Sequence, residues 1–199
     1  MTTDTHWDVQ SCPAVVLHQM LKLRHAALLS LWSSLAAPAL SELDGEYAGV
    51  LPIAGLPTES VGHIVASYYQ DESELGYWLG KAFTSRDDQC GEGYNIFRML
   101  RPGQAGYTFA RKGRYTTEVG PSLVDGRPSY LVRYPSLSKD GGGPRLVDEI
   151  RRYSKGLYLG TSTRSTPDGG RTSASECFLI TGPVNPWIGP DDRVAELPA

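Results

Sequence analysis

The sequence lacks the cysteine pattern of a disulfide framework or of a zinc site. Its three cysteines, Cys12, Cys90 and Cys177, are an odd number at irregular spacing, and they form no CxxC pair. Residues 1–10 are polar and lack the charged-then-apolar layout of a secretory signal. These absences predict a reduced, cytoplasmic protein in which a single disulfide is allowed but not required.

The chain also has no excess of positive charge. Lysine and arginine number 19 against 22 aspartate and glutamate residues, which gives a formal net charge of −3. A nucleic-acid-binding domain usually carries a basic stripe, and the densest basic group here, Arg111, Lys112 and Arg114, has the pattern of a hairpin turn. The most apolar stretch contains Lys22 and Arg24, which make it too polar for a membrane span. We therefore expect neither a nucleic-acid partner nor a transmembrane segment.

Signatures of the common catalytic and cofactor sites are absent as well. There is no G-x-S-x-G nucleophile motif, and the glycines of residues 91–93 lack the strand–loop–helix context of a phosphate loop. His18 and His25 lie seven residues apart on one face of a predicted helix. Because no carboxylates accompany them, these histidines are expected to pack or to face solvent rather than to bind a metal. The sequence therefore predicts no metal and no cofactor.

What the chain has in abundance is glycine, proline and tyrosine. Its 22 glycines and 14 prolines predict many turns and argue against a helical bundle, and its 11 tyrosines suit half-buried strands. After Leu43, short stretches of alternating polarity are separated by turn signals such as Asp125-Gly126, Lys155-Gly156 and Asp168-Gly169. This pattern predicts strands at residues 46–51, 77–84, 94–100, 107–111, 114–119, 129–134, 145–153, 157–164 and 172–181, whereas residues 62–70 fit either a strand or a short helix.

One long amphipathic helix is predicted before the strands. Apolar residues recur at helical spacing over residues 13–37, and Pro38 ends the pattern. The predicted organisation is a polar N-terminus with a helix packing on the barrel (1–42), a β-barrel domain (43–182) and a Pro- and Asp-rich tail over the surface (183–199). The predicted fold class is mainly β, an antiparallel barrel or sandwich of about eight to ten strands with a long N-terminal α-helix.

Two glycine- and aromatic-rich blocks add a resemblance to a known family. Residues 45–49, Gly-Glu-Tyr-Ala-Gly, resemble the G-x-W-x-G signature of the small GXWXG family, with Tyr47 in place of the tryptophan. Residues 76–83 resemble the second block of that family, and the uncharacterised domain that often follows it is similar to the segments around residues 125–128, 134, 148–151 and 157–160. The resemblance covers residues 43–180 and implies a calycin-like, lipocalin-like barrel that encloses a hydrophobic small molecule.

Several polar side chains fall on strand faces that are otherwise apolar, which marks them as candidate site residues. Burial in an apolar cavity raises the pKa of a carboxyl group toward neutral pH, so that it can transfer protons there. The predicted catalytic residues are Asp148 and Glu176 as acid or base with Lys81 and Arg133 as anion clamps, and the predicted ligand-binding residues are Tyr68, Trp78, Asn95, Tyr134, Tyr158 and Phe178. The alternatives are an internal salt bridge that fixes strand register, charges that face outward, and a Schiff-base role for Lys81.

These observations leave three functional hypotheses. The first is a cofactor-independent cyclase or isomerase of specialised metabolism, which needs only a shaped apolar cavity and one or two tuned acids. The second is a lipocalin-like carrier of a hydrophobic ligand without catalysis. The third is a partner-binding module that uses the amphipathic helix. The expected partner is a hydrophobic small molecule as ligand or substrate, and a homodimer is left open.

Overall fold

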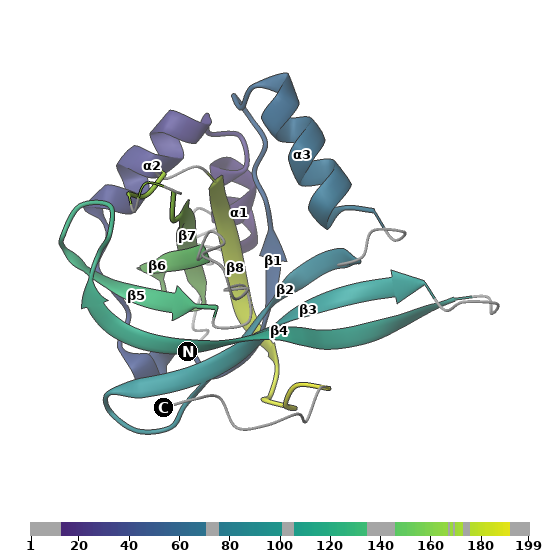
Figure 1. Ribbon diagram of the computed structural model, residues 1–199, viewed down its shortest axis with the longest axis vertical. Helices are drawn as coiled ribbons and strands as arrows, with labels where there is room; N and C mark the ends of the chain where they lie inside the picture. Colours follow the sequence, from purple (N-terminus) through teal and green to yellow (C-terminus); the bar gives the residue numbers. More distant parts are fainter. Residues whose placement is uncertain are drawn as a thin grey trace, which may run out of the picture.

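Eight antiparallel strands form a closed barrel in which each strand pairs with its neighbours along the chain and the last strand pairs with the first (Figure 1). The structure is a computed structural model, and it describes residues 13–70, 76–100, 106–134, 146–166, 168, 170–172 and 176–191. The strands are β1 (Gly45–Val50), β2 (Tyr77–Ser85), β3 (Cys90–Leu100), β4 (Tyr107–Pro121), β5 (Pro128–Arg133), β6 (Leu146–Ser154), β7 (Leu157–Arg164) and β8 (Glu176–Asn185). The prediction of a mainly β, antiparallel barrel is confirmed.

The N-terminal helix is broken into two, so the prediction of one long helix is wrong. The structure has α1 (Pro13–Met20) and α2 (His25–Ser34), separated by Arg24, whose backbone is extended at φ −66° and ψ 151°. The N–H of His25 donates a hydrogen bond to the carbonyl oxygen of Ala54, 3.0 Å away. This contact with the loop after β1 replaces a bond within the helix, and helical periodicity in the sequence carries no sign of it.

Two further helical segments lie at opposite ends of the barrel. Residues 62–70, which fitted a strand or a helix, fall largely in α3 (Thr58–Tyr68). The short 3-10 helix η2 (Leu40–Glu42) contacts β2 and β4 at the other end. None of the helices in the described part of the chain is long and apolar enough to cross a membrane.

A bulge in β4 stands where a hairpin turn was predicted. The segments 107–111 and 114–119 belong to one strand, and the pairing with β3 shifts by one residue between Gly93 and Asn95. Gly113 lies opposite this shift with φ +68°, a conformation that glycine adopts without strain. The extra residue bends the strand without reversing it, so β3 and β4 continue together beyond the rest of the barrel (Figure 1).

A second bulge, in β2, decides which side chains face the lumen. The pairing with β3 shifts between Trp78 and Gly80, and Trp78 consequently packs in the interior with Lys81, whereas Leu79 packs on the outside. Strict alternation along the strand would place Leu79 on the face of Lys81, and the bulge reverses this. Gly80 is required here because a Cβ at this position would lie 1.9 Å from the carbonyl oxygen of Tyr47.

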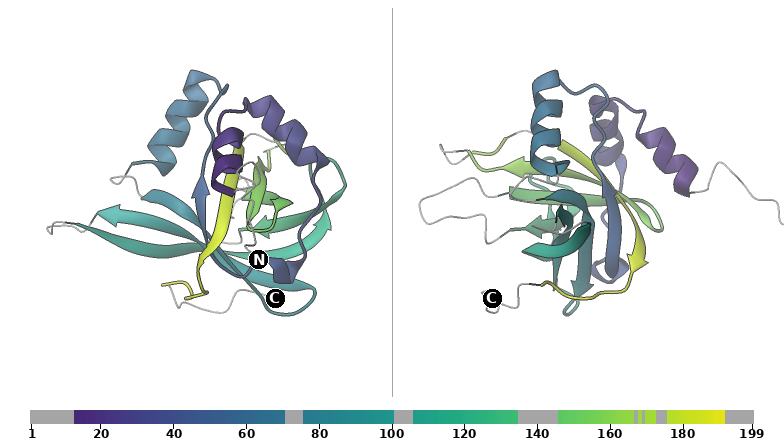
Figure 2. Two further views of the ribbon diagram at one scale, coloured as in Figure 1. Left: turned by 180° about the vertical axis from the view of Figure 1, so that it is seen from behind. Right: turned by 90° about the vertical axis from the view of Figure 1, so that its right-hand side faces the viewer.

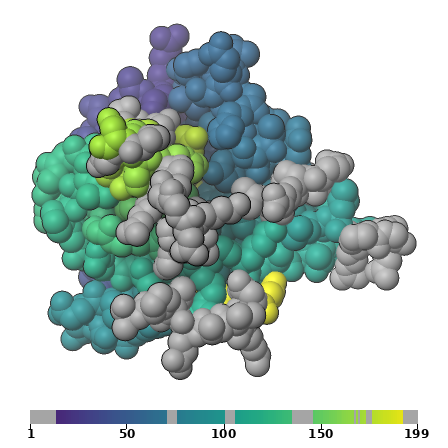
Figure 3. Space-filling model, in the orientation of Figure 1, coloured from purple at the N-terminus to yellow at the C-terminus, as the bar shows by residue number. Residues whose placement is uncertain are grey.

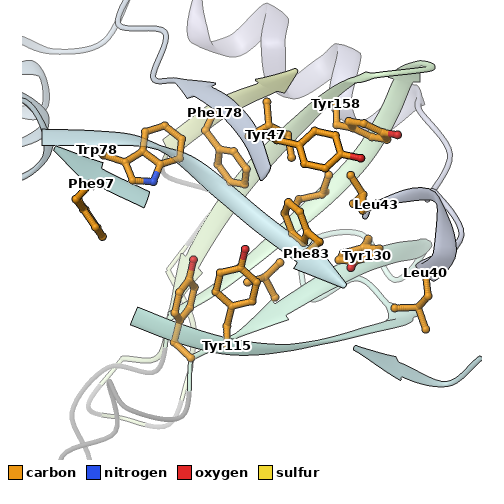
Figure 4. Packing of buried hydrophobic residues seen from close by; sticks show 14 residues of the cluster. Leu40, Leu43, Tyr47, Trp78, Phe83, Phe97, Tyr115, Tyr130, Tyr158 and Phe178 are labelled. Atoms are coloured by element: carbon orange, nitrogen blue, oxygen red, sulfur yellow. The ribbon is translucent and has the colours of Figure 1, made fainter. Parts of the chain in front are cut away.

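One end of the barrel is filled by aromatic rings (Figure 4). Tyr47 meets Phe83 and Tyr158 edge to face at centroid distances of 5.7 and 5.8 Å, and Phe83 meets Tyr130 in the same way at 5.7 Å. Leu43, just after η2, is fully buried against this cluster. Such close packing leaves no room for a ligand at this end.

The helices α1 and α2 cover the outer face of β7 and β8 (Figure 2, left). Leu28 and Trp32 of α2 are fully buried there. The guanidinium of Arg151, from β6, lies 4.0 Å from the Trp32 ring centroid and makes two hydrogen bonds, of 2.6 and 2.8 Å, to the carboxylate of Asp125. This buried arginine therefore joins the helix, the sheet and the loop after β4.

The C-terminal end of the barrel lies beyond the predicted domain boundary. β8 continues to Asn185, which pairs with Glu46 of β1, and the ring of Trp187 packs against that of Tyr94 at 4.7 Å. The first residues of the predicted tail are thus part of the sheet and its outer packing. The remainder of the predicted tail, residues 192–199, lies outside the described residues.

Replacing Trp32 by alanine tests the importance of the helix for the barrel. We expect Trp32→Ala to lower the free energy of unfolding by about 3–5 kcal/mol, because it removes a fully buried indole and the stacking partner of Arg151. Leu23→Ala, at a position that is 36% exposed, is the control and should change it by less than about 0.5 kcal/mol. Equal losses in the two variants, measured by urea denaturation, would show that α2 is dispensable.

Candidate functional site

The open part of the barrel interior is a cavity of about 360 Å³ at the end opposite the aromatic cluster. Its walls come from the beginnings of β2, β6 and β8, the middle of β3 and β4, the end of β7, the residue after β5, and α3. The surface of α3 lies beside that of the β7–β8 region in Figure 3. The lining residues are Leu51, Tyr68, Trp78, Lys81, Asn95, Phe97, Lys112, Gly113, Tyr134, Leu146, Asp148, Ser162, Glu176 and Phe178. The walls are thus mainly aromatic and aliphatic, with a few polar groups, as in small-molecule sites.

A buried ion pair crosses the lumen at the floor of this cavity. Lys81 Nζ lies 2.8 Å from Asp148 Oδ2, and both side chains are about 95% buried. Lys81 belongs to β2 and Asp148 to β6, which are four strands apart in a barrel of eight and therefore on opposite walls. The next interior residues along these strands toward the packed end are Phe83 and Ile150. The pair therefore separates the packed half of the barrel from the open half.

The ammonium group of Lys81 has an acceptor for each of its three protons. Besides Asp148, it donates to Asn95 Oδ1 at 3.0 Å and to the hydroxyl oxygen of Tyr134. Four rings surround it, with their centroids 5.1–6.0 Å away: Trp78, Tyr115, Tyr134 and Phe178. All three donor positions of the amine are thus occupied within the protein, whereas a Schiff-base nucleophile needs a free lone pair on the nitrogen.

The carboxylate of Asp148 is equally well supplied with donors. Tyr134 donates its hydroxyl proton to Oδ2 at 2.8 Å, and Ser162 donates to Oδ1 at 2.8 Å. Together with Lys81 this makes three charge-assisted or hydroxyl hydrogen bonds to one carboxylate. The arrangement corresponds to the internal salt bridge considered as an alternative to a catalytic role.

Tyr134 and Asn95 complete the network as neutral groups. Burial, with the charge of Asp148 close by, raises the pKa of Tyr134 well above its usual value, so the phenol stays protonated. Asn95 Oδ1 also accepts from Trp78 Nε1 at 3.2 Å, and its Nδ2 donates to the carbonyl oxygen of Gly113 at 3.3 Å. The network fixes the orientation of the indole that lines the cavity.

Glu176 is the carboxylate of the cavity that remains without such donors. In the strand register Asp148, Ser162 and Glu176 lie directly opposite one another on β6, β7 and β8, and Glu176 lines the cavity wall. Within the described part of the chain, no side chain donates a hydrogen bond to its carboxylate or forms an ion pair with it. The pKa of Tyr68, across the cavity on α3, is raised by burial and by the charge of Glu176.

A close contact between Gly160 and Phe178 shapes one wall. These residues lie opposite each other on β7 and β8, and a Cβ on Gly160 would lie 2.1 Å from the Cζ atom of Phe178. The ring therefore lies over the glycine backbone, which leaves the centre of the lumen open.

Two of the predicted site residues lie away from the cavity. Arg133 is on the outside of β5, 43% exposed in its side chain, and pairs with Glu118 at 2.8 Å, because its neighbours Val132 and Tyr134 face inward. Tyr158 faces inward, but at the packed end, where it lies beside Tyr47. The predictions that these residues reach the ligand site are wrong in position.

The other predicted site residues come together at the cavity: Asp148, Glu176, Lys81, Tyr68, Trp78, Asn95, Tyr134 and Phe178. Their roles stay predictions. Sequence reasoning missed Leu51, Phe97, Lys112, Leu146 and Ser162. Phe97 and Leu146 follow from alternation, since they share faces with Asn95 and Asp148, whereas Lys112 was hidden by the predicted turn.

The described residues contain few side chains that could bind a metal ion or act as a reactive thiol. No three His, Cys, Asp or Glu side chains among them are close enough to hold a metal ion. Cys90 and Cys177 are free, and burial raises the pKa of the Cys177 thiol to about 12. Cys177 therefore remains a protonated thiol on the outer face of β8, packed against α2.

Comparisons with known proteins place the fold but not the function. No protein-family model matches the chain, and no curated protein matches it. Among solved structures, a protein from Thermomonospora curvata is similar, with a TM-score of 0.52 and 16% sequence identity over 84% of this chain and 93% of that chain. At this identity the likeness shows the barrel fold alone. The resemblance to the GXWXG family stays a prediction.

Variants of the buried ion pair test how much the interaction between Lys81 and Asp148 contributes to the stability of the barrel. We expect Asp148→Asn to lower the free energy of unfolding by about 3–5 kcal/mol, because it leaves the Lys81 ammonium buried without a counter-charge. The double variant Lys81→Met with Asp148→Leu removes both charges and should lose less than the sum of the single variants. Glu118→Gln, in the exposed pair with Arg133, is the control and should cost less than about 1 kcal/mol.

Equal costs for Asp148→Asn and Glu118→Gln in urea denaturation would contradict this account. So would a double variant whose loss equals the sum of the two single losses, since additivity means that the charges do not interact.

Proposed function

We propose that the protein binds one small, mostly apolar molecule in the cavity of the barrel. The observation that carries the proposal is the cavity itself, about 360 Å³ enclosed by aromatic and aliphatic side chains, a volume within the usual range of small-molecule sites. Eight-stranded barrels are wide enough to hold one such ligand. The resemblance to the GXWXG family supports the same class of ligand, a hydrophobic small molecule in a calycin-like barrel.

The polar floor favours binding over chemistry at Asp148 and Lys81. Each of these groups already has three partners within the protein. A ligand that abuts this floor leaves the hydrogen bonds in place and gains free energy by burying its own apolar surface. The free energy of binding would thus come chiefly from Trp78, Phe97 and Phe178, whose rings line the walls.

A cofactor-independent cyclase or isomerase is the second candidate. The observation that favours it is the Glu176 carboxylate, which lines the cavity and receives no hydrogen bond from a side chain in the described residues. Such a carboxylate has lone pairs available to accept a proton from a bound molecule. If a substrate is found, Glu176→Gln should abolish its turnover while the melting temperature stays unchanged. A homodimer and a cytoplasmic location stay predictions from the sequence.

Ligand binding is tested with N-phenyl-1-naphthylamine, a neutral fluorescent probe for apolar sites. We expect saturable enhancement of its emission at one site per chain. Leu146→Trp should weaken binding at least about tenfold, because the larger side chain occupies the cavity. Val119→Trp, at a position that is 42% exposed and pairs with Tyr130 at the packed end, adds the same indole away from the cavity and serves as the matched control.

Two results would count against the proposal. One is the absence of saturable emission from the probe. The other is equal affinity in Leu146→Trp and Val119→Trp, which would place the probe on the surface rather than in the cavity.

A further inference from the structure

The charges of the cavity are unevenly distributed around its wall. Lys81 and Asp148 neutralise each other at the floor, 2.8 Å apart. Two further charged residues line the cavity from strands on opposite walls: Lys112 from β4 and Glu176 from β8. Lys112 Nζ lies 3.5 Å from the sulfur of Met99 and 5.3 Å from the ring centroid of Phe97. Its charge is thus held against β3, away from Glu176.

No side chain of the neighbouring strand β7 is hydrogen-bonded to the Glu176 carboxylate, and Arg164, at the end of that strand, is hydrogen-bonded to Tyr68 instead. Ser162, directly opposite on β7, directs its hydroxyl proton to Asp148 Oδ1. Thr161, also on β7, donates to the backbone carbonyl of Glu176 and not to its carboxylate. Glu176 is partly buried, so its carboxylate is open to the cavity, and a ligand that brings a positively charged donor can form a charge-assisted hydrogen bond with it.

The rings next to Glu176 favour the same sign of charge. Phe178 is the next interior residue on β8, and Tyr68 and Trp78 line the same cavity. The faces of aromatic rings attract cations through their quadrupole and disfavour anions. A negative charge among ring faces is the pattern by which proteins recognise an organic cation.

We propose that the ligand is a hydrophobic amine whose ammonium group pairs with Glu176 while its apolar body lies among Trp78, Phe97 and Phe178. The inference rests on the proposed function, because it concerns the occupant of the same cavity. It also gives the ligand an orientation in the cavity. The charged end lies at Glu176 of β8, and the apolar end lies over the ion pair of Lys81 and Asp148.

Three probes with one ring system separate the contribution of charge from that of shape: 1-naphthalenemethylamine, 1-naphthalenemethanol and 1-naphthoic acid. By isothermal titration calorimetry at pH 7, we expect the amine to bind at least about tenfold more tightly than the alcohol, as for a charge-assisted hydrogen bond. The acid should bind most weakly. In Glu176→Gln the amine should lose this advantage, while the affinity for the alcohol stays within about twofold.

Two further variants keep the result interpretable. Glu118→Gln removes one negative charge from the outer face and should leave all three affinities unchanged. Glu176→Asp keeps the charge in the cavity, and it should retain part of the preference for the amine even if Glu176→Gln fails to fold.

The possible failures are distinguishable. If none of the three probes binds to the unaltered protein, both the cavity proposal and this inference are overturned. If the alcohol or the acid binds as tightly as the amine, or if the amine keeps its advantage in Glu176→Gln, the inference of a cationic ligand is overturned while binding in the cavity stands.

Discussion

The ion pair between Lys81 and Asp148 is the constraint on which the interior of this barrel depends. It joins opposite walls, β2 and β6, and its partners are Asn95 of β3, Ser162 of β7 and Tyr134, which directly follows β5. Bringing two charges into the lumen is unfavourable unless each is fully hydrogen-bonded. The five side chains satisfy that condition only when the barrel is closed, so the network couples strand register to the integrity of the whole sheet.

The position of the pair also divides the lumen into a packed half and an open half. Toward one end, Tyr47, Phe83 and Tyr130 pack edge to face and fill the space. Toward the other end, Trp78 and Phe178 meet edge to face at a centroid distance of 6.4 Å and line the wall of the open cavity. One half of the interior is thus closely packed and the other half is open, and the hydrogen-bonded ion pair lies between them.

Alternating polarity along a strand predicts which face a side chain is on, but it does not predict how far along the barrel axis that side chain lies. Alternating polarity located the strands, and it placed Asp148, Asn95 and Phe178 on interior faces. It also contained the means to reject Arg133, because adjacent residues of a strand face opposite sides and Tyr134 was already assigned to the site. Alternation does not report the position of a residue along the barrel axis. Tyr158 faces the interior, as predicted, but it lies at the packed end.

The features that escaped prediction share a physical cause, which is that they depend on contacts between distant segments. The bulge at Trp78 and Gly80 arises where β2 approaches Tyr47 of β1, and the break before His25 arises from its hydrogen bond to Ala54. Neither contact leaves a periodic trace in the local sequence. The same is true of the pairing of Lys81 with Asp148, 67 positions apart in the printed sequence, since pairing needs the closed barrel to bring β2 and β6 to one level.

The contact between Gly160 and Phe178 has a consequence for how a barrel of this kind diverges. The width of the cavity is set in part by a glycine behind the ring, a residue that itself does not line the cavity. A single added methyl group at that position would push the ring into the lumen. The width of the lumen can therefore change through a residue that does not line it, so that descendants of this chain can differ in cavity size while every lining residue stays the same.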